Sequence, residues 1–383
     1  MGCSNIYAAN RTPPPMPASS WEALLATFAP HAAQIRLTGG EPTLYPDFFR
    51  ILELATSYDA WVTIYTNGRW KNPAQFVERL GGWPNLSGLL VSLHGAFPES
   101  HGSFSGTSSS FDEVLANILL ATENGIKVTL STVLTHLGWD EIEKVVALGQ
   151  QLGVQCTTFP RYLGNPLPEI EPTWEEMLTA VKRIEALIEA DVPVQHGICI
   201  PQCFVPNDSK GCQAGVALVA VDPWGNVRPC NFSPTVIGSL HKASIYELWH
   251  SDAMNAWRAL MPSECTTCAA YSVCHGGCRA VQELRPDGRD PLRGEPLSEY
   301  SPSPGIHELP ADARPRATVR MRPESFGYAL LGQGHIVPVS AEARPVNEAC
   351  DGSTTFSELA ARFGQGEIDL LGELWELGML KAV

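Results

Sequence analysis

Eight of the eleven cysteines of this chain lie between residues 199 and 278. Cys212 is followed after twelve residues by Gly225 and, after four more, by Cys230. The remaining part of the pattern is a closely spaced run, Cys265-x2-Cys268-x5-Cys274-x3-Cys278. A Cys-x2-Cys pair lets two thiolates hold one centre, and a repeated run with a distant cysteine is typical of iron–sulfur ligation. The spacing therefore favours electron transfer or radical chemistry over hydrolysis.

Two other uses of these cysteines stay open at this point. Disulfide frameworks are typical of secreted chains that are much shorter than this one. Zinc knuckles also use paired Cys-x2-Cys loops, although only one such loop occurs among the eight cysteines.

Composition narrows the class of protein. A length of 383 residues suggests two or three domains, and 44% apolar with 17% charged residues is typical of a globular chain. The net charge of −15 argues against binding to nucleic acid or to a membrane surface, which are themselves anionic. No apolar run of about twenty residues and no signal segment occurs. We expect a cytoplasmic protein without disulfides, in a compartment that keeps thiolate ligands reduced.

The first half of the chain alternates between short β-type runs and helical patterns. The β-type runs are Gln34–Thr38, Trp61–Thr66, Gly88–Leu93, Val128–Val133 and Gln155–Phe159. The helical patterns are Trp21–Phe28, Pro46–Ala55, Phe111–Thr122 and Glu141–Leu152, and Ser19 with Glu22 offers a capping box for the first. This alternation predicts an α/β fold, a parallel sheet with helices on its outer face. Ligands of such sheets bind where the strands end at their carboxyl edge.

The run Gly39-Gly40-Glu41-Pro42-Thr43 follows the first of these strands. Two glycines allow a ligand to approach the backbone, and the carboxylate beside them can accept hydrogen bonds from an ammonium group. The LTGGEPTL segment resembles the motif with which radical S-adenosylmethionine (SAM) enzymes hold the methionine amine of their cofactor. The cysteine pattern resembles the SPASM extension of those enzymes, which carries auxiliary [4Fe–4S] clusters. The resemblance covers residues 1 to about 280.

The resemblance implies a partial (β/α)6 barrel, of which the first strand is apparently missing here, and a cofactor pocket at its edge. The positions that match the family's cofactor site are Gly39, Gly40, Glu41, Pro42, Thr66, Asn67, Ser92, His94 and Arg161. By the same resemblance, Arg161 is placed like the residue that pairs with the cofactor carboxylate.

The resemblance also distributes the cysteines over two auxiliary clusters. One would use Cys212, Cys230 and Cys278, with Cys203 or Cys199 upstream. The other would use Cys265, Cys268 and Cys274. Its fourth ligand stays open between Cys199, a carboxylate such as Asp287 or Asp290, and an iron site without a protein ligand.

The N-terminus departs from the family pattern. Radical SAM enzymes bind their catalytic cluster with Cys-x3-Cys-x2-Cys, and an alignment on Tyr7 makes Cys3 the middle cysteine. Ile6 then occupies the third position, and the first would precede Met1. We expect a truncated or degenerate copy, or a sequence with an error, whose radical SAM cluster site is incomplete.

A different composition begins after the last cysteine of the run. Residues 285–315 are rich in Pro, Gly, Glu and Ser and are predicted to be a linker. A hairpin is predicted at Phe326–Leu331 and His335–Val339, followed by three helices near residues 345–350, 356–363 and 369–377. Thr355 with Glu358 forms a capping box. We expect a small winged-helix-like α+β unit over residues 316–383.

This tail resembles the pyrroloquinoline quinone peptide-chaperone family, whose members bind the leader of a precursor peptide. The likeness is carried by the segments Arg322–Gly327 and Asp351–Thr354. Six basic and nine acidic residues at positions 316–383 argue against the DNA binding of other winged helices. The expected domains are a radical SAM barrel at 1–192, a SPASM domain at 193–284, the linker, and a leader-binding domain.

Together the resemblances imply a maturase of a ribosomally made precursor peptide. In such enzymes, reductive cleavage of SAM gives a 5′-deoxyadenosyl radical that abstracts hydrogen from the peptide. The implied partners are a precursor peptide with a leader segment and a reductant protein of the flavodoxin or ferredoxin type. Two alternatives are a non-catalytic iron–sulfur peptide-binding protein and an enzyme like the anaerobic sulfatase maturases.

Overall fold

The computed structural model describes residues 14–383 except 59, 164–166, 168, 198–199, 206–210, 286, 301–308, 325–326 and 333–334. The chain divides into two compact units. The first extends to Tyr300, apart from residues 31–35 and 59–61, which group with residues 301–383 in the second. Residues 287–300, which were predicted to belong to the linker, group with the first unit.

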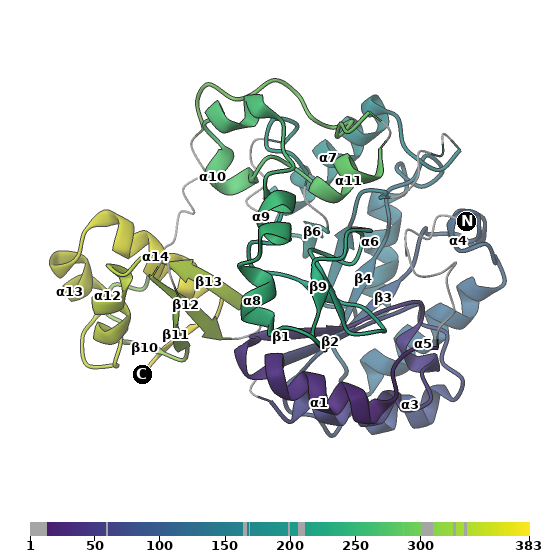
Figure 1. Ribbon diagram of the computed structural model, residues 1–383, viewed down its shortest axis with the longest axis horizontal. Coiled ribbons are helices and arrows are strands. Elements are labelled where there is room, and N and C mark those ends of the chain that lie inside the picture. Colours follow the sequence, from purple (N-terminus) through teal and green to yellow (C-terminus); the bar gives the residue numbers. More distant parts are fainter. Residues whose placement is uncertain are drawn as a thin grey trace. The chain divides into compact units, whose positions relative to one another are not determined.

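A six-stranded sheet forms the centre of the first unit (Figure 1), with its strands in sequence order. They are β1 Gln34–Leu37, β2 Trp61–Thr66, β3 Leu86–Ser92, β4 Val128–Ser131, β5 Cys156–Phe159 and β6 Val194–His196. Each pairing from β2 to β6 is parallel. The predicted α/β class and its five β-type runs are confirmed. The strand β6 escaped prediction because only Val194 of its three residues is apolar.

Seven α-helices in the described part of residues 14–197 accompany this sheet. They are α1 Ala18–Phe28, α2 Phe48–Thr56, α3 Pro73–Leu80, α4 Pro98–Ser105, α5 Ser110–Glu123, α6 Ile142–Gln151 and α7 Trp174–Glu189. The four predicted helices are present, with ends that differ by up to three residues. The predicted capping box at Ser19 is wrong, because α1 already begins at Ala18, with Pro17 before it.

The two faces of the sheet differ in polarity. One face packs against helices: a Cβ at Gly68 would touch Val91 of β3 and Val114 of α5, and one at Gly149 of α6 would touch Leu130 of β4. Residues in register with these on the neighbouring strands share their face. The opposite face carries Tyr65, Leu90, Ser92, Thr129, Ser131, Cys156, Thr158 and Gln195. This second face is mostly polar and is suited to a polar ligand.

The cysteine-rich part of the first unit is built from short elements. A small antiparallel sheet is formed by β7 Ala220–Val221, β8 Asn226–Arg228 and β9 Gly238–Ser239. The short helices are α8 Ile245–Trp249, α9 Asp252–Arg258, η3 Ser263–Thr267, α10 Tyr271–Cys274 and α11 Arg279–Leu284. Elements this short bury little apolar surface, so cross-links such as metal sites contribute a larger share of stability in such regions.

The structure shows why a glycine stands at position 225, between Cys212 and Cys230. Its φ of +80° closes the turn between β7 and β8, and a Cβ there would lie 2.6 Å from Nε2 of His241. The buried carboxylate of Asp222 accepts hydrogen bonds from the backbone N–H groups of Trp224 and Asn226 in the same turn. The turn thus leads β8 toward Cys230.

The second unit is an α+β fold, as predicted. A three-stranded antiparallel sheet is formed by β11 Arg320–Glu324, β12 Gly327–Gly332 and β13 His335–Val339, in that order. A second sheet pairs β10 Pro315–Ala317 with β14 Leu380–Ala382, and the helices are α12 Ala343–Ala349, α13 Phe356–Arg362 and α14 Gln365–Glu376. The capping box of Thr355 and Glu358 is confirmed at the start of α13. Strand β11 was not predicted.

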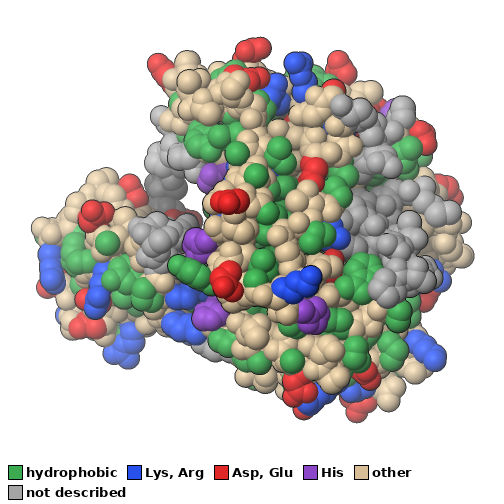
Figure 2. All heavy atoms as spheres, viewed as in Figure 1, with side chains coloured by type: hydrophobic (Ala, Val, Ile, Leu, Met, Phe, Trp, Pro, Cys, Tyr) green, Lys and Arg blue, Asp and Glu red, His purple; other side chains and the backbone are tan. Residues whose placement is uncertain are grey.

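Figure 2 shows both acidic and basic side chains on the face that it draws. Among the described residues, no helix combines the length and the apolar character that a bilayer crossing needs.

Candidate functional site

The turn Gly39–Pro42 stands at the carboxyl end of β1. Gly39 has a φ of +147°, a conformation that favours glycine. A Cβ on Gly39 or Gly40 would have no other heavy atom within 4 Å. Pro42 begins the short helix η2, Pro42–Leu44. The space beside the two exposed glycines fits the close approach of a ligand that the sequence predicts.

Glu41 ties this turn to the next strand. Its Oε1 accepts hydrogen bonds from Thr43 N and Oγ1 and from Thr66 Oγ1, and its Oε2 accepts one from Asn67 N at 2.6 Å. The carboxylate was expected to face a ligand ammonium group. Instead, the structure shows that four donors of the chain already engage it, and Oε2 keeps the greater remaining capacity.

Thr66 is fully used by the protein. Its hydroxyl donates to Glu41 and accepts from Gly68 N at 3.2 Å and from Trp70 Nε1 at 3.0 Å. One donor and two lone pairs are all that a hydroxyl has. Thr66 therefore positions the turn, whereas the adjacent Asn67 is exposed at the edge.

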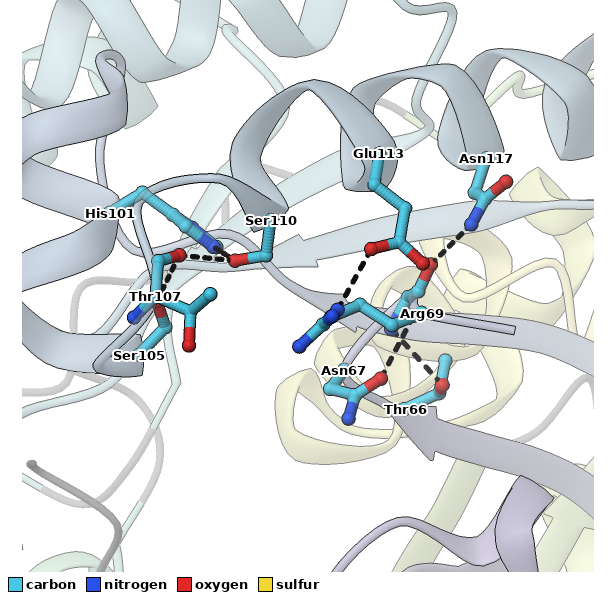
Figure 3. A network of polar contacts seen from close by, with 10 residues as sticks. Thr66, Asn67, Arg69, His101, Ser105, Thr107, Ser110, Glu113 and Asn117 are labelled. Carbon is cyan, nitrogen blue, oxygen red and sulfur yellow. Dashed lines mark hydrogen bonds and ion pairs between the residues drawn. The ribbon is translucent and has the colours of Figure 1, made fainter. Parts of the chain in front are cut away.

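A second layer of contacts holds the loop after β2 (Figure 3). The side chain of Asn67 accepts from Arg69 N, Arg69 Nε pairs with Glu113 at 2.9 Å, and Asn117 donates to the carbonyl of Gly68. Glu113 and Asn117 lie on α5, so this helix fixes the orientation of the loop.

Ser92 is the last residue of β3, and His94 follows two residues later. Ser92 lies on the polar face of the sheet, in register with Ser131. His94 is buried against Phe104 and His101, and this burial lowers its pKa to about 3, with a further contribution from His101. Its imidazole is therefore neutral at physiological pH. Figure 3 also shows how His101 Nε2 meets Ser110 Oγ, at 2.9 Å.

Arg161 has a protein partner in place of the predicted cofactor carboxylate. Its two terminal nitrogens donate to the two carboxylate oxygens of Asp290 at 2.9 and 2.8 Å, and both side chains are at most 4% exposed. Asp290 Oδ1 also accepts from Leu292 N. This geometry does not support the predicted cofactor contact of Arg161, nor Asp290 as an iron ligand.

Four cysteines line one cavity, Cys203, Cys265, Cys268 and Cys274. The pKa of Cys265 is raised to about 11, mainly by burial; Arg293 opposes this shift, and the three other thiols add to it. Two of the sulfurs already accept backbone hydrogen bonds, Cys203 from Gly294 N at 3.2 Å and Cys268 from Leu297 N at 3.4 Å. Four thiols with backbone donors to sulfur fit a [4Fe–4S] cluster. Cys203 was expected with the other cysteine group, and the structure places it here.

The second group consists of Cys212, Cys230 and Cys278, which share one hydrophobic core. Burial raises the pKa of Cys230 to about 11, and burial together with Cys212 raises the pKa of Cys278. Arg161 lowers the pKa of Cys278 in turn, so the Arg161–Asp290 pair lies within electrostatic reach of this group.

Two predicted ligands, Cys3 and Cys199, lie outside the described residues, as does Ile6. Among the described side chains, no three potential ligands converge on a single metal ion. In a [4Fe–4S] cluster each thiolate binds a different iron, so its cysteines surround the cluster without converging on one point.

Three features of the site were missed by sequence reasoning. The backbone donors of Gly294 and Leu297 lie in the supposed linker, where composition alone gave no signal. The bidentate partner of Arg161 is 129 residues away in the sequence. Gln202 lines the four-cysteine cavity and is completely buried, which its polar character did not predict.

Comparison with known families now identifies both regions. Residues 2–149 match the description "Radical SAM superfamily", and residues 212–278 match "Iron-sulfur cluster-binding domain", the SPASM family. The chain is 27% identical over 322 residues to a PqqA peptide cyclase from Ruegeria pomeroyi, which covers 78% of this chain and 83% of that protein. It is also 27% identical over 296 residues to an AdoMet-dependent heme synthase from Methanosarcina barkeri, covering 70% and 82%.

A solved structure shares the fold. Streptococcus suis SuiB bound to its precursor peptide SuiA superposes with a TM-score of 0.63 and 18% identity, covering 76% of this chain and 72% of SuiB. At this identity the likeness concerns the fold alone.

Proposed function

From the premise that this chain belongs to the radical SAM enzymes that carry a SPASM domain, we propose that it modifies a ribosomally made precursor peptide. One observation carries the proposal: the open edge at Gly39 and Gly40 and the two cysteine groups belong to the same compact unit. The similarity to a peptide cyclase along 78% of the chain supports a peptide substrate. The bound cofactors supply the radical chemistry, and the protein binds, orients and shields.

Hydrogen bonds within the chain position the proposed cofactor edge. Glu41 and Thr66 connect the glycine turn to the end of β2, while Ser92 presents a hydroxyl on the polar face. We assign SAM to this edge, with Gly39, Gly40 and Asn67 nearest to it.

The cysteines would hold two auxiliary [4Fe–4S] clusters. Cys203, Cys265, Cys268 and Cys274 supply a complete set of four ligands for one cluster. Cys212, Cys230 and Cys278 supply three for the other, and Cys199 is the proposed fourth. We further propose that a reductant protein of the flavodoxin or ferredoxin type supplies electrons to the clusters in the cytoplasm.

The radical SAM cluster is proposed to be incomplete in this sequence. Cys3 matches one position of the cysteine motif, whereas Ile6 has no donor atom at another. The test is 5′-deoxyadenosine release under dithionite, measured by chromatography. We expect no release by the 383-residue chain. Release should follow when Ile6→Cys is combined with an N-terminal extension that restores the first strand and the cysteine four positions before Cys3. Either repair alone should fail, and turnover by the unmodified chain would show that another residue completes the site.

The second unit is proposed to recognise the leader of the peptide by strand addition. Within its described residues, β12 is flanked on both sides, by β11 and β13, so β13 offers the free edge of the predicted hairpin. Backbone hydrogen bonds would then supply affinity, which added salt weakens little.

Titration of the full chain with leaders encoded beside its gene tests this recognition. We expect saturable binding that is insensitive to salt. Binding of heme precursors and of no leader would favour the chemistry of the heme synthase relative. Leader binding without turnover, even in the repaired chain, would favour a non-catalytic peptide-binding protein. Modification of a sulfatase instead of a leader peptide would favour the sulfatase-maturase alternative.

A further inference from the structure

Gln202 is a buried amide without a protein partner. The residue is 0% exposed, and neither its Oε1 nor its Nε2 has a hydrogen-bond partner among the described residues. A primary amide carries two N–H donors and an acceptor oxygen. Buried polar groups are nearly always paired, so this orphan requires an explanation.

Gln202 lies at a cavity that also contains four thiols. Gln202 lines the same cavity as Cys203, Cys265, Cys268 and Cys274. It occupies a tight turn in which Phe204 N and Val205 N both donate to the carbonyl of Pro201, and this turn fixes the backbone next to Cys203. Gln202 is therefore held in place by backbone contacts and not by its own amide.

The charged side chains of this cavity are already engaged. Asp290 is paired with Arg161, and Arg293 is paired with Glu264 at 3.0 Å. The sulfurs of Cys203 and Cys268 already accept N–H donors from the 294–297 segment. Donation to sulfur thus already occurs twice in this cavity, and the amide of Gln202 is a further potential donor.

We propose that the side-chain N–H of Gln202 donates a hydrogen bond to a sulfur of the iron–sulfur cluster held by these four cysteines, and that it raises the reduction potential of that cluster. The inference rests on the cluster assignment in the proposed function. Reduction adds negative charge to the sulfurs, and a donor stabilises the more negative form more strongly. Gln202 is a positioning and tuning residue and makes no contact with substrate in this proposal.

The first test replaces the amide with an apolar side chain of similar length in the full chain, Gln202→Met. Gln213→Met is the matched control, because Gln213 is exposed and lies beside Cys212. Potentiometry monitored by electron paramagnetic resonance on anaerobically reconstituted protein should show one cluster with a more negative midpoint in Gln202→Met and unchanged midpoints in Gln213→Met. Unchanged midpoints in Gln202→Met, at wild-type iron content, would overturn the proposal.

The second test does not depend on how the variant folds. Wild-type protein labelled with ¹⁵N in its glutamine side chains should show hyperfine coupling between ¹⁵N and a reduced cluster, and Gln213→Met should retain it. A reduced cluster without such coupling in the wild type would overturn the proposal. If the wild-type protein took up neither iron nor sulfide, the cluster assignment itself would be wrong. This result differs from a reduced cluster without ¹⁵N coupling, which would overturn only the role of Gln202.

Discussion

At the scale of single residues, the motif side chains hold one another. Glu41 and Thr66 form hydrogen bonds within the chain, whereas their neighbours Gly39, Gly40 and Asn67 are exposed. The residue types predicted a cofactor site, but only the structure separates the residues that hydrogen-bond to one another from those that remain exposed.

The buried Arg161–Asp290 pair gives a prediction about stability. Asp290→Asn leaves the guanidinium buried without a counter-charge, which costs about 3–5 kcal/mol. Chemical unfolding of the full chain measures this loss. Glu22→Gln is the control, since Glu22 pairs with Arg50 on the surface and its loss should cost less than about 1 kcal/mol. Equal effects of the two changes would contradict the account.

His196 gives a prediction about pH. Burial lowers its pKa to about 4, and both ring nitrogens lack partners among the described residues. Between pH 6.5 and 4 the unfolded chain binds a proton that the folded chain does not, so stability present above pH 6.5 is lost as the pH falls. Between pH 7 and pH 5, the unfolding free energy of His196→Gln should fall by about 2 kcal/mol less than that of the wild type.

The measurement is a urea titration of wild type and variant at both pH values. His250→Gln serves as the control, because His250 is exposed on the surface. A wild-type pH dependence that persists in His196→Gln would show that other groups account for it.

At the scale of elements, the sequence pattern predicted those strands and helix ends that depend on neighbouring residues in the chain. The strand Trp61–Thr66 was predicted with its observed bounds, because alternate positions face the helices and the polar side of the sheet. Thr355 caps α13 as predicted, whereas Ser19 does not cap α1, since the helix begins one residue before it. Strand β6 and the segment 287–300 depend on distant partners, which composition does not reveal.

The turn at Gly225 gives a prediction at this scale. Gly225→Ala forces a side chain into a positive φ and against His241, so the unfolding free energy should fall by about 1–3 kcal/mol. Gly82→Ala is the matched control, because Gly82 has open space and no unusual φ. Thermal or urea unfolding of both variants measures the difference. A Gly225→Ala protein as stable as Gly82→Ala would contradict this role of the turn.

At the scale of the whole molecule, function depends on residues far apart in the sequence. The cavity joins Cys203 to Cys265, Cys268 and Cys274, and its wall is completed by residues as distant as Pro296. Spacing predicted that these cysteines bind iron, whereas the family resemblance placed Cys203 or Cys199 with the other group. Which thiols meet is decided by packing of the short helices and of the 287–300 segment, for which the sequence carries no period or motif.

The most direct test of the account is the metal content of the anaerobically reconstituted full chain. We predict roughly eight irons with matching sulfide, in two [4Fe–4S] clusters. Cys265→Ala and Cys230→Ala should each lower the iron content, whereas Cys156→Ala should not, because Cys156 lies on the sheet, in register with Thr129. Protein that binds zinc and takes up neither iron nor sulfide would contradict the central claim.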